Sequence, residues 1–414
     1  MKKKYKLLKY ACYSGNVCMS VVGNLSPLLF ITFRTLYGIS YSLLGLLVLV
    51  NFSTQLLVDL IFSFFSHRFD IPKTVKTIPV ITIVGFVFYA GAPIIFPNHV
   101  YLGLVIGTII FSAACGLSEV LISPVIAAIP SENPDREMSK LHSIYAWGVV
   151  FVVIFSTLFL SLFGRESWQW LAVIFTGIPI AGCILFSRSE IPEMETPERV
   201  SGAVAFLKRK ELWLCFLAIF LGGASECTMA QWSSGYLEQA LGIPKVWGDI
   251  FGVAMFAVML GIGRSWYGKY GKNIGKVLFL SAVGATLCYL IAVISPIPIM
   301  GLVACAFTGL CVAMLWPGSL IVGAERVPDG GVFLYAMMAA GGDLGASVVP
   351  QTVGVLTDYF EQSSFALQMA QNFGLTVEQM SMKMGMSVAI LFPLLAIFVY
   401  LYIWKTEKVK LLKE

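Results

Sequence analysis

The chain has 414 residues, of which 58% are hydrophobic and only 12% are charged, and its mean hydropathy is +0.83. A soluble protein of this size needs more charged residues to cover its surface, so the composition excludes a soluble globular protein. The net charge of +5 indicates contact with anionic lipid headgroups rather than with nucleic acid.

Twelve apolar segments follow one another along the chain, and each is long enough, at about 1.5 Å per residue, to cross a hydrocarbon core of roughly 30 Å. They cover residues 9–32, 41–66, 77–97, 101–128, 141–163, 169–187, 211–238, 246–267, 275–295, 298–326, 331–358 and 386–405. We therefore predict an all-α membrane protein with twelve transmembrane helices. The short loops leave no room for a soluble catalytic domain.

The basic residues between these segments are sorted by side. With a cytoplasmic N-terminus, all but four of the 28 Lys and Arg residues fall on the cytoplasmic side; the exceptions are Arg34, Arg165, Lys245 and Lys383. This bias predicts a multi-pass protein of the cytoplasmic membrane with both termini in the cytoplasm. The first segment is too long for the apolar region of a signal peptide and lacks a typical cleavage site, so we expect it to be retained.

Small motifs repeat at a constant offset of 193 residues. Gly116 and Pro124 match Gly309 and Pro317, and Gly148 matches Gly341. This repeat predicts two pseudo-symmetric six-helix halves, residues 1–187 and 211–414, joined by a cytoplasmic loop at 188–210. Transporters of this design bind their solute near the bilayer midplane, between the halves.

Four carboxylates fall inside apolar segments and away from the segment ends: Asp59, Glu119, Glu226 and Asp343. Each costs about 2.5–3.5 kcal/mol near the bilayer centre on insertion scales, so each needs a function or a hydrogen-bonded partner. Glu119 is the first candidate for a proton carrier, because Pro124 weakens the helix close to it. The alternative is a structural carboxylate bonded to a neighbouring helix. Asp59 is interpreted as a gate or loop contact.

Polar and aromatic residues of the seventh segment suggest a solute site. Glu226 and Gln231 could hold hydroxyl groups, and the Trp232 ring could stack on the C–H face of a sugar. The alternative is a helix–helix contact, with Trp232 as an anchor at the membrane interface. Asp343 either lines the path of the solute or pairs across the bundle.

The first half offers a second set of candidates. His142, Tyr145 and Trp147 begin the fifth segment and could form the floor of a cavity, although an aromatic belt at the interface explains them equally well. Asn24 of the first segment is included as a further candidate for solute binding. Asn51 and Gln55 lie four residues apart on one helix face and are interpreted as helix–helix hydrogen bonds.

Other chemistry has little support in the sequence. The three histidines, at 67, 99 and 142, are too scattered to form a metal site. The sequence contains neither a serine-hydrolase G-x-S-x-G motif nor an ATP-binding G-x-x-x-x-G-K-[ST] motif. All nine cysteines fall within apolar segments, where they behave as small packing residues. We expect neither a metal nor a cofactor.

Several motifs resemble one known family. Twelve segments in two halves are similar to the major facilitator superfamily. The E-x-x-x-S-P motif from Glu119 to Pro124 resembles the fourth helix of fucose–proton symporters, and Ala224-Ser225-Glu226 followed by Trp232 resembles their seventh. Residues 141–148, 325–328 and 342–345 are similar as well. The departures are Ser123 in place of the family's Asn and a loop at 66–73 that lacks the superfamily's leading Asp and Gly.

This resemblance implies a monomeric secondary transporter that moves a sugar, or another small polar solute, by alternating access. It implies that Glu119 carries a coupled proton and that Glu226, Gln231 and Trp232 hold the solute. The alternatives are an exporter or uniporter of another metabolite, or an intramembrane enzyme acting on lipid-linked substrates. The solute, the coupling ion and the direction of transport are not determined by the sequence.

Overall fold

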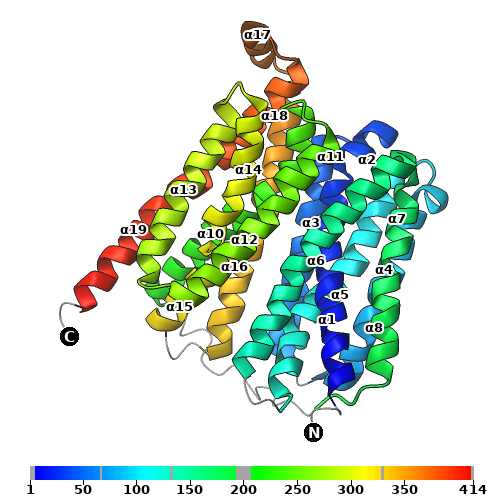
Figure 1. Cartoon of the computed structure of the whole chain (residues 1–414), viewed down its shortest axis with the longest axis vertical. Helices are drawn as coiled ribbons and strands as arrows, with labels where there is room; N and C mark the ends of the chain where they lie inside the picture. The colour runs from blue at the N-terminus through cyan, green and yellow to red at the C-terminus, as the bar shows by residue number, and fades with distance from the viewer. Residues whose placement is uncertain (1–4, 66–67, 131–133, 193–206, 328–330, 412–414) are drawn as a thin grey trace. The chain divides into compact units, whose positions relative to one another are not determined.

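The computed structural model describes residues 5–65, 68–130, 134–192, 207–327 and 331–411, and in these ranges its regular elements are all helices (Figure 1). Within the described residues, ten helical stretches are long and apolar enough to cross a membrane. They become eleven if α1 (Lys6–Leu28) and α2 (Phe30–Tyr37), which are bent by 45°, form one span. The predicted all-α membrane fold is confirmed.

The remaining predicted span, 331–358, corresponds to α16 (Gly331–Glu361), which is 31 residues long. It is not among the ten stretches, and Gly341, Gly342, Asp343 and Gly345 interrupt its apolar sequence. Its length still matches a membrane crossing, because 31 residues extend over roughly 45 Å.

The chain forms two compact units. Unit 1 contains residues 1–38 and 50–201, and unit 2 contains residues 39–49 and 202–414. The start of α3 (Tyr41–Phe65) therefore belongs to unit 2 and the rest of this helix to unit 1. Most of the predicted central loop 188–210 lies outside the described residues, so the exact limits of the two halves stay a prediction.

Unit 1 is built from the first six predicted spans. Besides α1, α2 and most of α3, its elements are α4 (Ile71–Ile95), α5 (Val100–Ala128), α6 (Pro134–Phe163), the short η2 (Arg165–Ser167), α7 (Trp168–Phe175) and α8 (Gly177–Ser187). The sixth predicted span is thus divided into α7 and α8 at Thr176, whose hydroxyl donates to the carbonyl oxygen of Val173.

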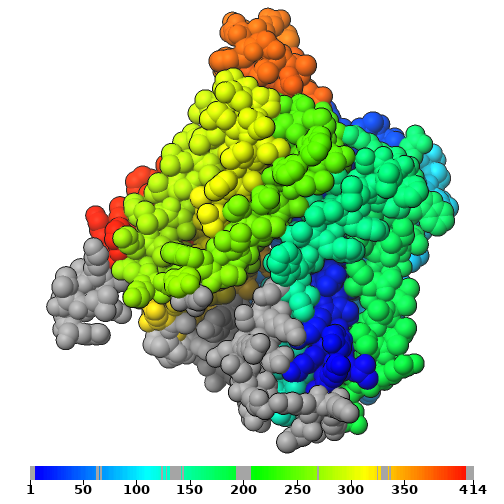
Figure 2. Space-filling model, in the orientation of Figure 1, coloured from blue at the N-terminus to red at the C-terminus, as the bar shows by residue number. Residues whose placement is uncertain are grey.

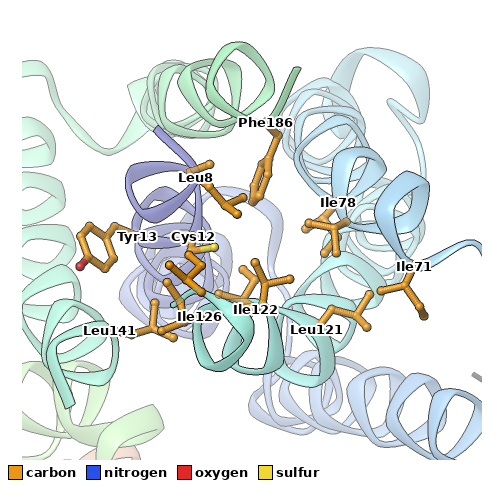
Figure 3. Packing of buried hydrophobic residues seen from close by; sticks show 14 of the residues in the cluster. Leu8, Cys12, Tyr13, Ile71, Ile78, Leu121, Ile122, Ile126, Leu141 and Phe186 are labelled. Atoms are coloured by element: carbon orange, nitrogen blue, oxygen red, sulfur yellow. The ribbon is translucent and has the colours of Figure 1, made fainter. Parts of the chain in front are cut away.

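One part of the core of unit 1 is an apolar cluster that joins several of its helices (Figure 3). It joins Leu8 and Cys12 of α1 to Ile78 of α4, Ile122 of α5 and Phe186 of α8. The opposite face of α4 is also apolar but exposed, at Val80, Val84 and Val87. An exposed apolar face at helical spacing is what a lipid-facing helix requires.

Helices α4 and α5 approach each other closely through glycines on both partners. A Cβ on Gly85 would lie 2.6 Å from the backbone nitrogen of Phe111, and one on Gly107 would lie 2.8 Å from the Cα of Tyr89. Small residues allow such contact between backbones, which is how membrane helices gain packing energy without a hydrophobic driving force.

The loop before α4 has a capping role. Asp70 accepts a hydrogen bond from the backbone nitrogen of Lys73 at 3.1 Å and pairs with its ammonium group at 2.7 Å. These bonds hold the pKa of Asp70 below its usual value. The aspartate of this loop therefore starts a helix, while the preceding Ser66 and His67 lie outside the described residues.

Unit 2 is built from the last six predicted spans. Its elements are α10 (Lys210–Gln239), α11 (Lys245–Trp247), the π-helical η3 (Gly248–Ala254), α12 (Met255–Tyr270), α13 (Ile274–Ile294), α14 (Pro298–Val312), α15 (Leu315–Arg326), α16, α17 (Ser364–Phe373), α18 (Val377–Ala389) and α19 (Leu391–Leu411). Helix α10 packs against α14, α15 and α16, and α12 packs against α14 (Figure 1). Helix α17 stands beyond the ends of the other helices of this unit (Figure 2).

The matching glycines of the repeat make equivalent helix crossings in the two units. Gly116, in the fourth span, meets the backbone of Gln55 in the second span, and Gly309, in the tenth, meets Phe256 in the eighth. Similarly, Gly148, in the fifth span, meets α1, the first, and Gly341, in the eleventh, meets α10, the seventh. The repeat seen in the sequence thus corresponds to repeated close packing.

Candidate functional site

A membrane-embedded ion pair lies in unit 2. Nη2 of Arg264, on α12, donates to both carboxylate oxygens of Glu226, on α10, at 2.9 and 3.2 Å. Glu226 lies near the middle of its helix, and its side chain is 14% exposed, against 37% for Arg264. The arginine side chain leans toward the start of its helix, as helical side chains do, and this direction brings its charge toward the middle of the span.

Arg264 makes a second contact at a helix break. Its Nε donates to the carbonyl oxygen of Ala313 at 3.1 Å, in the turn between α14 and α15. In a continuous helix this oxygen would accept from the residue four positions later, which is Pro317 and has no N–H. Arg264 thus satisfies a polar group that the proline leaves exposed inside the membrane.

Asp343 belongs to the same neighbourhood. Electrostatic interactions join the Cys227 thiol of α10 to Glu226, Asp343 and Arg264. Asp343 is only 4% exposed. The Glu226–Arg264 pair and Asp343 therefore share Cys227 as a neighbour, on three helices of unit 2.

Glycines bring α10 and α16 together beside these charges. A Cβ on Gly223 would lie 2.5 Å from the carbonyl oxygen of Gly342, and one on Gly345 would lie 2.2 Å from the carbonyl oxygen of Phe220. The Trp316 ring packs against both Gly223 and Gly342, and its side chain is only partly buried. An aromatic surface thus lies one helical turn from Glu226.

The residue predicted to stack on a sugar has a different position. Trp232 is 1% exposed, its ring lies 6.0 Å from that of Tyr41, and its Nε1 donates to the carbonyl oxygen of Pro350 at 3.0 Å. Both the face and the N–H of this indole are used in packing within unit 2. Gln231 is also buried, at 6% exposure. Their predicted contact with a solute stays a prediction, and Trp316 is a partly buried aromatic side chain beside the charges.

Two carboxylates also meet in unit 1. Asp59 of α3 and Glu119 of α5 interact electrostatically, and Glu119 is exposed whereas Asp59 is partly buried. The crossing of the two helices at Gly116 explains this, because Gly116 touches Gln55 and Val58 and the carboxylates follow about one turn later on each helix. Asp59, interpreted from the sequence as a gate or loop contact, is thus a neighbour of Glu119.

A buried polar cluster lies on the same two helices. Ser112 of α5 donates to Oδ1 of Asn51 at 2.6 Å, and Nε2 of Gln55 donates to the same oxygen at 3.1 Å. The predicted hydrogen bonding of Asn51 and Gln55 is confirmed, both along α3 and across to α5. The Ser112–Asn51 bond ties α3 to α5 about two turns away from the Asp59–Glu119 pair.

The remaining candidates in unit 1 are spread along α1 and α6. Asn24 donates to the carbonyl oxygen of Ser20 at 2.8 Å, and Ser20 in turn donates to the backbone oxygen of Tyr145 at 2.8 Å. Trp147 is 68% exposed. The side chain of His142 lies outside the described part of the structure. A role for these four residues in solute binding stays a prediction.

A second intramembrane ion pair was not foreseen. Lys245 pairs with Asp249 at 3.0 Å and donates to the hydroxyl of Ser234 at 2.8 Å, and its side chain is 11% exposed. Likewise, Lys383 donates to the carbonyl oxygens of Val293 and Ser295, at the end of α13. Both lysines, expected in outer loops, thus bind within the helical bundle of unit 2.

Sequence reasoning missed Arg264 and Trp316 for identifiable reasons. Arg264 was counted with the basic residues of the following loop, although it lies inside the eighth apolar segment. Trp316 directly precedes Pro317 and Gly318, and a helix break in an apolar segment is itself a sign of a binding site in transporters.

Among the described residues, no group of three or more His, Cys, Asp or Glu side chains could hold a metal ion.

Paired charged groups on apolar spanning helices, together with a broken helix and an internal repeat, indicate a membrane transporter rather than an enzyme. The chain belongs to the Major Facilitator Superfamily, whose family model matches residues 12–350. This finding confirms the family resemblance of the sequence and excludes the alternative of an intramembrane enzyme.

Solved structures of transporters share the fold. A bacterial homolog of the human lysosomal transporter Spinster, inward-facing and occupied, superimposes with a TM-score of 0.72 at 13% sequence identity, covering 98% of this chain and 97% of that one. A D-xylose–proton symporter gives 0.69 at 16% identity, covering 94% and 97%. The E. coli fucose–proton symporter FucP gives 0.58 at 14% identity, covering 95% and 99%. No curated protein sequence matches the chain.

Proposed function

We propose that the protein is a proton-coupled carrier of a small polar solute, with a sugar as the first candidate. The observation that carries this proposal is the pairing of Glu119 with Asp59 on two spanning helices of unit 1. Two negative charges side by side in an apolar bundle repel each other, and one bound proton relieves this repulsion. The pair therefore suits a group that gains and loses a proton during transport.

The solute site of this proposal lies in unit 2, beside Glu226 and Arg264. The polar groups of the ion pair and Asp343 can hold hydroxyl groups, and Trp316 offers an aromatic face for the C–H surface of a sugar. Two structural neighbours, a D-xylose–proton symporter and a fucose–proton symporter, support the choice of sugars for the first screen.

The nucleoside transporter NupG is also a neighbour, at a TM-score of 0.67, so nucleosides form the second group of solutes to screen. An exporter or a uniporter of another metabolite remains the alternative. In the proposal the protein is a monomer of the cytoplasmic membrane, surrounded by lipid, with both termini in the cytoplasm.

Transport by purified protein in liposomes tests the proposal. An inward proton gradient should drive accumulation of a solute found in a binding screen, and a protonophore should abolish that accumulation. Glu119→Gln fixes the group as neutral, so it should abolish accumulation while exchange of labelled for unlabelled solute continues. Ser118→Ala, on a neighbouring buried position of α5, serves as the control and should retain both activities.

Other outcomes contradict specific parts of the proposal. If Glu119→Gln retains accumulation, Glu119 is not the coupling group, and Asp59→Asn is the next variant to measure. If a gradient of protons never drives accumulation of a bound solute, the protein is not a proton-coupled symporter. If accumulation, exchange and protein yield all fall together in Glu119→Gln, the carboxylate has a structural role.

A further inference from the structure

We propose that the solute carries an anionic group, most simply a carboxylate, and that Arg264 binds this group when Glu226 takes up a proton. The inference rests on the proposed function of a proton-coupled carrier and narrows its solute from sugars in general to sugar acids.

The guanidinium of Arg264 is only partly used by the protein. Its five N–H groups form a rigid fork. Nε donates to Ala313 and Nη2 donates to Glu226. Among the described residues, Nη1 has no hydrogen-bond acceptor. Nη1 is therefore open, and the Nη1–Nη2 edge can bind a carboxylate with two parallel bonds once Nη2 releases Glu226.

The exposure of Arg264 fits an open binding edge. Its side chain is 37% exposed although it lies on a spanning helix. An exposed charge on such a helix faces a water-filled path or the bundle interior, because contact with lipid is too costly. Arg264 is thus accessible to a dissolved solute.

Charge balance explains why a proton must accompany the anion. Arg264 on α12 faces Glu226 on α10, and the Cys227 thiol beside Glu226 interacts with Asp343 on α16. While Glu226 is ionised it neutralises Arg264, so a further anion is not attracted to the guanidinium. Protonation of Glu226 removes one negative charge, so the incoming anion replaces the charge that Glu226 has given up.

The other titratable groups around Glu226 do not supply a positive charge. Cys227 follows it on α10, and Tyr289 of α13 donates its hydroxyl to the carbonyl oxygen of Ser225 at 2.8 Å. Cys305 of α14 interacts with Tyr289. Arg264 is therefore the cation at this position among the described residues. It pairs with Glu226 when the site is empty and with the solute anion when the site is occupied.

The exchange involves no covalent bond within the solute. A proton from solution binds one carboxylate oxygen of Glu226, and the hydrogen bonds from Nη2 to that carboxylate weaken. The guanidinium then donates to the two oxygens of the solute carboxylate. Release reverses these steps: the proton leaves Glu226, the ion pair forms again, and the solute anion is expelled.

Trp316 selects the rest of the solute. Its ring packs on Gly223 and Gly342 and is partly exposed beside the charged cluster. An aromatic face next to a carboxylate-binding arginine fits a small ring that has hydroxyl groups, a C–H face and one acidic substituent. Hexuronic acids have these features. The parent hexoses have the same ring and hydroxyl groups but lack the carboxylate.

Matched sets of ligands test the inference. Glucuronate, glucose and glucosamine share one ring and differ in charge, as do galacturonate, galactose and galactosamine. Binding to the purified protein is measured by calorimetry at pH 5.5 and pH 7.5. We expect the acid of at least one set to bind tenfold or more tightly than its neutral partner at pH 5.5, and this advantage to shrink at pH 7.5.

Two variants separate the roles within the ion pair. Arg264→Lys keeps the positive charge but removes the fork, so affinity for the acid should fall at least tenfold. Glu226→Gln leaves Arg264 free of its carboxylate partner, so the acid should bind equally well at both pH values. Arg188→Gln, at an exposed position, is the matched control and should bind like the wild type. Size-exclusion chromatography verifies that each variant is folded.

The outcomes distinguish this inference from the proposed function. If the neutral sugar binds as well as its acid, or the amine binds best, while a proton gradient still drives accumulation, the anionic solute is wrong and the proton-coupled carrier stands. If acid binding persists unchanged in Arg264→Lys, Arg264 is not its ligand and the inference fails. If none of the six compounds binds or accumulates, both the inference and the choice of sugars are wrong.

Discussion

The Nε–H of Arg264 donates to the carbonyl oxygen of Ala313 at 3.1 Å. Pro317 cannot donate to this oxygen because it has no backbone N–H. The same guanidinium holds Glu226 at 2.9 Å. One side chain thus connects an intramembrane carboxylate with the break between α14 and α15. Any change in the charge of Glu226 alters the partner of a group that also supports a broken helix.

The break itself is the subject of the first prediction. Pro317→Ala restores an N–H that can donate to the carbonyl oxygen of Ala313, so α14 and α15 should join into a straighter helix. We expect a higher melting temperature and slower solute exchange in liposomes. Pro298→Ala is the matched control, because Pro298 begins α14 and a proline is tolerated there. Equal exchange rates in both variants would show that the break is not used in transport.

The second prediction concerns the strength of the Arg264–Glu226 pair. Arg264→Gln leaves Glu226 without its cation, and Arg264 is 37% exposed, so the loss should be about 1–3 kcal/mol, below the roughly 3–5 kcal/mol of a fully buried pair. The double variant with Glu226→Gln should recover most of that loss. Thermal unfolding in detergent measures all four proteins, and additive losses would mean that the two side chains do not interact.

The third prediction compares two tryptophans. Trp232→Phe removes the hydrogen bond to Pro350 and should lower stability by about 0.5–1.5 kcal/mol, with little effect on solute affinity. Trp316→Ala should instead weaken binding of an identified solute by about 1–2 kcal/mol, the scale of an aromatic anchor. Calorimetry and thermal unfolding separate the two effects. A loss of affinity in Trp232→Phe alone would restore the role predicted from the sequence.

The fourth prediction concerns orientation in the membrane. A single cysteine in place of Gln371, on the exposed face of α17, should react with a membrane-impermeant maleimide in intact cells. A cysteine in place of Lys208 should react only after the cells are opened. Lys245 is unsuitable for this test because it is paired with Asp249 and almost buried. Reaction of position 208 in intact cells would contradict a cytoplasmic start of α10.

The sequence by itself determined the class of fold and the positions of the four carboxylates away from the helix ends. Segment length and apolar composition are local properties, and in a bilayer they require a helix because every backbone polar group has to be satisfied within the segment. The offset of 193 residues also identified the repeat from the sequence alone. In the structure, Gly116 and Gly309 each permit a close crossing with a neighbouring helix.

Only the tertiary structure decided which charges meet. Glu226 and Arg264 are 38 residues apart in the chain, and Asp59 and Glu119 are farther apart still, so no local pattern reveals their pairing. The same is true of Trp232 and Trp316: both lie on apolar helices, but helix packing buries the first against Pro350 and leaves the second partly exposed beside Glu226. The partners of a side chain on a spanning helix depend on the rotation and crossing of that helix, which are set by contacts with neighbouring helices rather than by hydropathy.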